Sequence, residues 1–166
     1  MNMLTQGRGE HRGYDIMQVC LNGHQITTMA VSNPEFRREF CKDCGAKVIA
    51  GCANCSKPMR GYNHGSMVVR SPPVPKYCED CGTAFPWQEA AIENLTEILR
   101  DDGLDDQQMA AFEAALPDVI RDTPKTESAS LRIGKILSKL GKPAYDVSIK
   151  VLSDLASETA KKAMGL

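Results

Sequence analysis

The chain of 166 residues contains 42% hydrophobic and 25% charged residues, which excludes wholesale disorder and is typical of a globular protein of one or two small domains. Its 20 basic and 21 acidic side chains give a formal net charge of −1, which is a poor overall balance for binding phosphates. No window approaches the roughly 18 uninterrupted apolar residues of a membrane span, so we expect no membrane association.

The first 14 residues form a polar leader that lacks the apolar stretch of a secretory signal. We therefore expect no export and a cytoplasmic location, where thiols stay reduced. His11 lies in this leader, and we expect it to take no part in a site. The chain has seven cysteines, and six of them form close pairs. In a reducing compartment this pattern favours metal ligands over structural disulfides.

The segment 16–85 is rich in cysteine and poor in long apolar runs, so it needs something other than a conventional core for stability. Structural zinc takes four sulfur or imidazole ligands, and eight ordered ligands therefore predict two zinc ions per chain. Gly45 and Gly82 follow the second cysteine of their pairs, where the turn favours a positive φ. The predicted ligand pairs are Cys20 with His24, Cys41 with Cys44, Cys52 with Cys55, and Cys78 with Cys81.

Three other uses of these cysteines compete with zinc binding. A redox CxxC normally begins a helix after a strand in an α/β unit, and no such unit is visible around the three pairs. Disulfides of a secreted protein would call for an export signal and usually an even cysteine count. Iron–sulfur ligation is chemically open to the four cysteines of the second set.

Loop entropy does not decide which two ligand pairs bind the same ion. Neighbouring pairs would close loops of 16 and 22 residues, whereas a crossed, RING-like arrangement would close loops of 27 and 33 residues. The crossed loops together cost less than about 1 kcal/mol more than the sequential ones. We favour sequential pairing, because each half then consists of two knuckles joined by a short β-rich excursion, as in a zinc ribbon.

The fourth ligand of the first set is predicted to be His24. Without it Cys20 would leave this set with three cysteines, and the turn at Asn22 and Gly23 can fold His24 back toward Cys20. His64 is the reserve candidate and is otherwise a loop residue.

Beyond residue 86 the pattern changes to helical spacing and predicts about four short helices in the region 87–166. The first carries Leu95 and Leu99 and ends near Gly103, and the second begins near Asp105 and is ended or kinked by Pro117. The third has Thr126 as its N-cap and Leu131, Ile133, Leu137 and Leu140 on its apolar face. The fourth runs from roughly 144 to 164 and aligns Ser148, Leu152, Leu155 and Thr159.

Charge and aromatic residues offer weak signals of a binding surface. Seven thiolates and two zinc ions would bring the first 85 residues from a formal +3 to about zero, and the tail carries −4. Local basic patches remain near Arg37 and Arg38 and around the second ribbon, and the segment 71–75 should be extended and polyproline-like. The candidate binding residues are Arg60, Tyr62, His64 and Trp87, although packing against the ribbon is the plainer role for Trp87.

The series CxxxH, CxxCG, CxxC, CxxCG resembles the double zinc ribbon class. With Arg60-Gly61-Tyr62-Asn63-His64 and Pro86-Trp87 it resembles an uncharacterised bacterial family catalogued as domain of unknown function 2321, over about residues 16–87. This resemblance implies a bacterial zinc-ribbon protein and supplies no activity.

The sequence therefore predicts an α+β chain with a double zinc ribbon at 15–86 and a small all-α region at 87–166. We interpret it as a protein-interaction or scaffold module that binds a protein partner or itself through the helical region and is not an enzyme. The ligand count closes both zinc sites, and no HExxH, P-loop, GxSxG or Rossmann motif is present. Nucleic-acid binding is the first alternative, and a subunit of an enzyme complex is a distant one.

Overall fold

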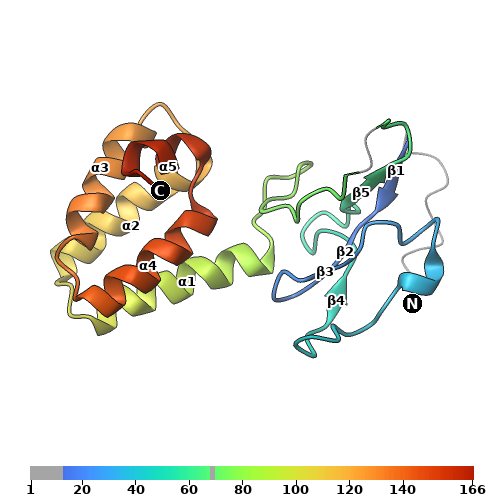
Figure 1. The fold of residues 1–166 in the computed structure, drawn as a ribbon, viewed down its shortest axis with the longest axis horizontal. Coiled ribbons are helices and arrows are strands. Elements are labelled where there is room, and N and C mark those ends of the chain that lie inside the picture. The colour runs from blue at the N-terminus through green and yellow to red at the C-terminus, as the bar shows by residue number, and fades with distance from the viewer. Residues whose placement is uncertain (1–12, 68–69) are drawn as a thin grey trace. The chain divides into compact units, whose positions relative to one another are not determined.

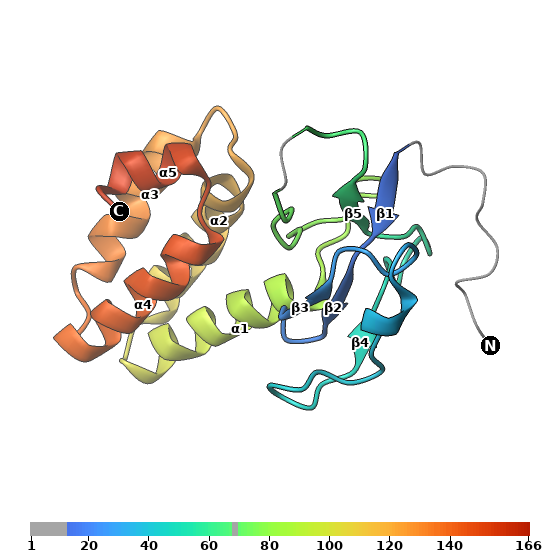
Figure 2. The same ribbon diagram turned by 45° about the vertical axis from the view of Figure 1, so that its right-hand side comes forward.

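The computed structural model describes residues 13–67 and 70–166. His11 and all but the end of the predicted leader thus lie outside the described residues. The chain divides into two compact units, Met1–Glu89 and Ala90–Leu166, each with its own internal packing. The strands belong to the first unit, and the helices α2 to α5 belong to the second (Figures 1 and 2). The α+β fold class and the order of its two parts are confirmed.

The first unit holds two small antiparallel sheets joined by irregular loops. In one sheet β1 (Tyr14–Ile16) pairs with β5 (Arg60–Asn63). In the other sheet, β2 (Gln18–Cys20) lies between β3 (Gln25–Thr27) and β4 (Val48–Ile49). A short 3-10 helix, η2 (Pro34–Phe36), lies between β3 and β4 along the chain. The strands are only two to four residues long, so the sheets cannot by themselves bury a large apolar face.

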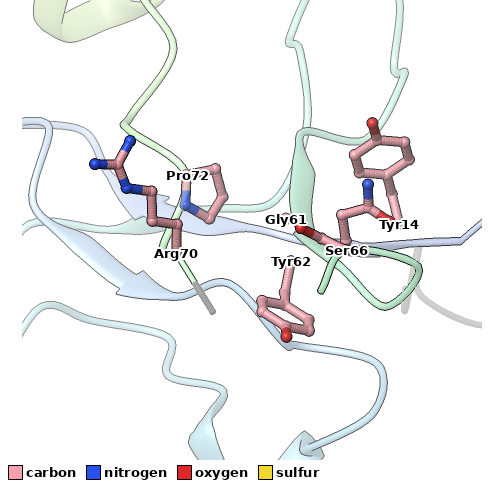
Figure 3. Close-up of a pocket in the computed structure, with 7 residues that line it drawn as sticks. Tyr14, Gly61, Tyr62, Ser66, Arg70 and Pro72 are labelled. Carbon is pink, nitrogen blue, oxygen red and sulfur yellow. The ribbon is translucent and has the colours of Figure 1, made fainter. Parts of the chain in front are cut away.

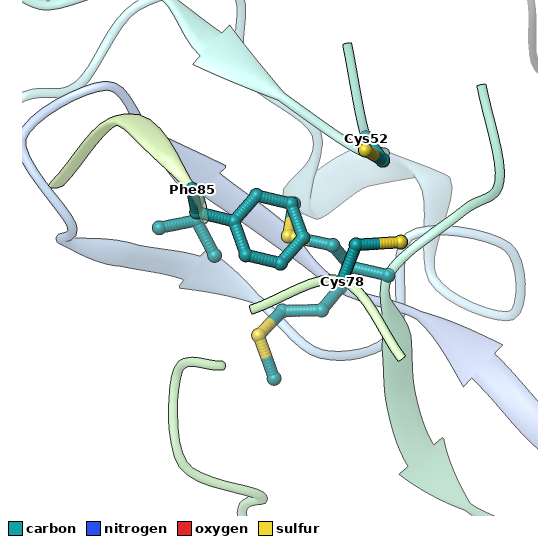
Figure 4. Close-up of a cluster of buried hydrophobic side chains, with 6 residues drawn as sticks. Cys52, Cys78 and Phe85 are labelled. Atoms are coloured by element: carbon teal, nitrogen blue, oxygen red, sulfur yellow. The ribbon is translucent and has the colours of Figure 1, made fainter. Parts of the chain in front are cut away.

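A small apolar cluster lies beside the second cysteine set (Figure 4). Trp87 packs against this cluster and stacks on Phe85 with ring centroids 4.8 Å apart. Its indole Nε1 donates to the carbonyl of Pro75 at 2.8 Å, which holds the proline-rich loop against the ribbon. The structure thus gives Trp87 a packing role. The buried members of the cluster are Met17, Val19, Cys52, Met59, Cys78 and Phe85.

A buried carboxylate ties three separate segments of the first unit together. Asp15 is 4% exposed and accepts hydrogen bonds from the amides of Ile16 and Val31, from the amide and hydroxyl of Ser32, and from Nε2 of His64. Burial raises the pKa of this carboxyl, but the hydrogen bonds from Ser32, Val31 and Ile16 outweigh it and lower the pKa to about 2. The charged form of Asp15 is therefore the stabilising one.

The second unit is built on amphipathic helices, and α1 begins at the end of the first unit. In the described residues these are α1 (Pro86–Asp101), α2 (Asp106–Arg121), α3 (Thr126–Leu137), α4 (Lys142–Leu155) and α5 (Glu158–Met164). As predicted, α2 begins beside Asp105, whose side chain accepts from the amide of Gln108 in a capping box. No helix in the described part of the chain has the length and apolar character needed to cross a membrane. Fully buried side chains at the centre of this unit include Leu95, Leu99, Phe112, Val119, Ile133, Leu137, Leu152 and Leu155.

The predicted single helix at 144–164 is wrong, because the chain breaks between α4 and α5. Ala156 has an extended backbone, and the amide of Ser157 donates to the carbonyl of Val119 in α2 at 3.0 Å. The hydroxyl of Ser157 then accepts from the amide of Ala160 and starts α5. A hydrogen bond to α2 and a new N-cap at Ser157 therefore divide the predicted helix into two.

The other helix predictions are modified in three places. Of the two outcomes predicted for Pro117, an end of the helix is excluded, since α2 continues to Arg121 with Leu116, Val119 and Ile120 buried on both sides of the proline. Thr126 is the first residue of α3 and not its N-cap, and its hydroxyl donates to the carbonyl of Asp118 at 2.7 Å. Leu131, which we placed on the apolar face of this helix, is 62% exposed.

The Asp15 contacts predict that Asp15→Asn destabilises the first unit by about 2 kcal/mol, because a charged acceptor of several buried donors is lost. The measurement is urea unfolding of the metal-loaded protein at neutral pH. Since the folded-state pKa of about 2 lies below the ordinary 3.8, this stabilisation is present above about pH 4 and is lost as the pH falls toward 2. Glu39→Gln, at an exposed position outside the CxxC pairs, is the matched control, and equal losses in both variants would contradict the role of Asp15.

Candidate metal centres

The three CxxC pairs share one backbone geometry, a tight knuckle closed by two hydrogen bonds. The amide of the first cysteine donates to the carbonyl five residues later, and its carbonyl accepts from the amide four residues later. An isolated antiparallel bridge flanks each knuckle, so each one is the tip of a minimal hairpin. The bridges join Phe40 to Lys47, Gly51 to Pro58, and Tyr77 to Ala84.

The residue after the second cysteine has a left-handed backbone in all three knuckles. Gly45 and Gly82 have φ of 70° and 71°, as their sequence positions predict. Ser56 takes the same conformation with φ of 61° in the remaining knuckle. No glycine marks this third position, where the Cys52 to Cys55 knuckle places a serine in the left-handed conformation.

Cys20 and His24 occupy the hairpin between β2 and β3, which is a different kind of turn. Gly23 has φ of 85° and donates its amide to the carbonyl of Cys20 at 2.9 Å. The amide of His24 donates to the sulfur of Cys20 at 3.3 Å. The turn at Asn22 and Gly23 therefore returns His24 to Cys20, as predicted.

The eight side chains gather into two sets of four, and the ligand atoms within each set lie within 4.8 Å of one another. In the first set the sulfurs of Cys20 and Cys44 are 3.7 Å apart, and Nδ1 of His24 lies 3.6 Å from the sulfur of Cys41. In the second set two pairs of sulfurs, Cys52 with Cys81 and Cys55 with Cys78, are each 3.6 Å apart. The sets are those of sequential pairing.

These separations fit the edges of a tetrahedron around one metal ion. A tetrahedral ion with metal–sulfur bonds of about 2.3 Å, the length typical of zinc, places its sulfurs about 3.8 Å apart. Disulfide sulfurs would lie at about 2.05 Å, which none of these pairs approaches. Each set can therefore hold one metal ion with four protein ligands.

The protein environment stabilises negative charge at the outer sulfur of each set. A hydrogen bond from the backbone of Ala46 lowers the pKa of Cys44, and the hydroxyl and amide of Thr83 lower the pKa of Cys81 to about 6. Both cysteines are exposed, whereas Cys20, where desolvation raises the pKa, is buried. A bound cation removes the mutual repulsion of four adjacent thiolates, so metal binding and ionisation of the thiols favour each other.

The remaining candidate residues lie outside both ligand sets. His64 contacts Asp15 at 3.2 Å and packs edge-on against Tyr62. Arg60 pairs with Glu79 at 2.6 Å, and its guanidinium lies 5.0 Å from the ring centroid of Tyr14. The Asp15 to His64 contact was missed by sequence reasoning, because the two residues are 49 positions apart and form no recognisable motif.

Two sequential sets of four ligands, each on paired knuckles, define this chain as a double zinc-ribbon protein with a helical C-terminal unit. The family model described as "Uncharacterized protein conserved in bacteria (DUF2321)" matches residues 13–164. The chain belongs to this family, whose match extends through the helical unit beyond the ribbon motifs. No curated protein and no solved structure shows significant similarity to the chain.

The two histidines provide a matched pair for testing the first set. His24→Ala should remove or strongly weaken one bound metal ion and leave the second, because Nδ1 of His24 lies within the first set. His64→Ala should retain both ions, because its imidazole contacts Asp15 instead. The measurement is the metal-to-protein ratio of the purified variants. Loss of metal from the His64 variant alone would reverse the assignment.

Proposed function

We propose that this protein holds two structural zinc ions and acts in the cytoplasm as a protein-interaction or scaffold module without catalytic activity of its own. Zinc suits sets of thiolate and imidazole ligands, since it accepts sulfur and nitrogen in tetrahedral geometry. Four protein ligands per ion leave no open position for a substrate or a reactive water, which supports a structural role.

The surface of the helical unit carries the interaction part of the proposal. Leu131 on α3 is 62% exposed, although the neighbouring positions Ala129 and Ser130 are buried. It lines a concavity of about 440 Å³ together with Thr159, Lys162 and Ala163 of the α5 segment and with Glu127. A concave surface with an apolar side chain at its rim and charged residues beside it suits a peptide segment or a second copy of the chain.

The basic residues of the first unit support the protein-partner proposal over nucleic-acid binding. The guanidinium of Arg37 donates to the carbonyl of Ala30, and that of Arg38 donates to the carbonyls of Glu35 and Arg37. Arg60 is paired with Glu79. These groups are already engaged within the protein, so phosphates would have to compete for them.

The zinc part predicts two zinc ions per chain on metal analysis of protein purified without added metal. Chelation should abolish the tertiary structure of the first unit, because its strands are short and its apolar cluster is small. Near-ultraviolet circular dichroism of Trp87, which stacks on Phe85 in this unit, reports the change. The helical content of the second unit is the internal control and should persist. One zinc ion or none per chain would contradict the proposal.

The interaction part predicts that Leu131→Asp abolishes the capture of a protein partner from a bacterial lysate, or self-association measured by light scattering. The reason is that a charge at the rim of the concavity opposes burial of the apolar surface. Val147→Asp is the matched control, since Val147 on α4 belongs to the same unit and is also exposed, at 50%, but does not line the concavity.

Two outcomes would contradict this prediction. One is a partner that is lost in the Val147 variant and kept in the Leu131 variant. The other is micromolar binding of DNA or RNA at about 0.15 M ionic strength that disappears when Arg37, Arg38, Lys57 and Arg60 are replaced by alanine. The second outcome would promote the nucleic-acid alternative.

A further inference from the structure

The side chains around the hollow beside the β1–β5 sheet do not converge on one point. Figure 3 shows the rings of Tyr14 and Tyr62 pointing to opposite sides and the guanidinium of Arg70 turned away from both. Each ring also has its own contact, because the ring centroid of Tyr14 lies 5.0 Å from the guanidinium of Arg60 and Tyr62 packs edge-on against His64. This hollow therefore offers no common site, and the outer face of α3 is the better candidate for recognition.

The outer face of α3 places one exposed leucine between two opposite charges. Glu127 lies four positions before Leu131, and Gly134 and Lys135 lie three and four positions after it, so these residues share one face of the helix. Leu131 is 62% exposed and stands midway between the acid and the base. The buried face of the helix carries Ala129, Ser130, Ile133, Ile136 and Leu137.

The two charges of this face have no partner within the chain. Neither Glu127 nor Lys135 forms an ion pair with any side chain in residues 13–67 and 70–166. They are eight positions apart, which is about 12 Å along an α-helix, so they cannot pair with each other. On the neighbouring α5, by contrast, Lys161 is paired with Glu158 at 2.8 Å. The face thus presents one isolated negative charge and one isolated positive charge on either side of Leu131.

Gly134 leaves a notch one turn beyond Leu131. A Cβ added at Gly134 would meet no heavy atom within 4 Å, so no contact in the described part of the chain requires glycine at this position. Glycine in a helix interior is less favourable than alanine, because it loses more backbone entropy on folding. Leu131 also borders the concavity of about 440 Å³ that α3 shares with α5, which lies beside α3 in both ribbon views (Figures 1 and 2). The surface therefore combines a protruding leucine with room for another one.

We propose that the outer face of α3 binds the same face of a second copy of the chain, with the two α3 helices antiparallel about a twofold axis beside Leu131. Glu127 of each copy then lies opposite Lys135 of the other copy, and each Leu131 packs against the notch and the concavity of the other copy. The inference rests on the proposed interaction function and names its partner.

The charges of the face favour a second copy over an unrelated peptide. A twofold interface brings the same residues together from both sides, so a surface pairs with itself only when it is self-complementary. Glu127 and Lys135 meet this condition, because they have opposite signs and lie at equal distances from Leu131. They also lie in the first and last turns of α3, and the dipoles of two antiparallel helices oppose each other favourably.

The test is sedimentation velocity of the full-length, zinc-loaded protein over a series of concentrations. The test variants are Glu127→Lys, Lys135→Glu and the double variant with both reversals. Arg132→Glu is the matched control, since Arg132 is an exposed base of the same helix that lies off this face. Zinc content and far-ultraviolet circular dichroism show that each variant is folded.

One helix face is a small interface, so we expect a weak dimer whose fraction increases with protein concentration. Each single reversal sets like charges opposite each other at two symmetric positions and should weaken dimerisation about tenfold. The double variant should dimerise like the unchanged protein, because its charge pairs form again with exchanged signs. Pairing within one chain cannot explain this recovery, given the separation of the two residues along the helix. The Arg132 variant should also dimerise normally.

The dimer inference is overturned if the protein stays monomeric at every concentration, if its dimer withstands both single reversals, or if the double variant fails to recover. These results are distinguishable from failure of the proposed function. A monomeric protein that still captures another protein in a manner abolished by Leu131→Asp would refute the second copy as partner and support the interaction module. A monomeric protein without such capture would refute both.

Discussion

The first unit depends on the gathering of eight ligand atoms into two sets whose members lie within 4.8 Å of one another. Ionisation is uneven within a set. At Cys55 the backbone hydrogen bond from Lys57 lowers the pKa, but desolvation and the neighbouring cysteines raise it to about 12, whereas the pKa of Cys81 in the same set is lowered to about 6. A divalent cation stabilises all the thiolates of a set at once, including those whose pKa is raised by their neighbours. The knuckles present their sulfurs at the spacing that one tetrahedral ion requires, so the local fold and ion binding are two aspects of one constraint.

This constraint explains why the two units are built so differently. The first unit has strands of two to four residues and an apolar cluster in which Cys52 and Cys78 are themselves members. The unit is further stabilised by the hydrogen bonds that the Asp15 carboxylate accepts. The second unit has helices with continuous buried faces, exemplified by the fully buried Phe112 and Leu152, and its stability rests on apolar burial.

The same division bears on function. Metal ligation occupies the knuckle tips, which leaves the faces of the first unit available for recognition. The concavity at Leu131 belongs to the second unit, and its lining combines an apolar side chain with charged neighbours.

Much of this architecture was readable in the sequence because it depends on short-range chemistry. The ligand pairs, the glycines at positive φ, the cap at Asp105 and the family resemblance all rest on residues a few positions apart, and the double zinc ribbon and its family are confirmed. Sequential pairing was favoured by the pattern but not fixed by it, because loop entropy differs little between the two arrangements.

What only the tertiary structure decided depends on contacts between distant segments. The break at Ala156 follows from a bond between Ser157 and Val119, and helical periodicity contains no trace of that bond. The exposure of Leu131 results from which face of α3 packs against its neighbours. The Asp15 to His64 contact joins β1 to the residue after β5 across 49 positions. Local sequence determines turns, caps and ligand spacing because their energies lie within a few residues, whereas burial and long-range hydrogen bonds exist only once the chain has folded.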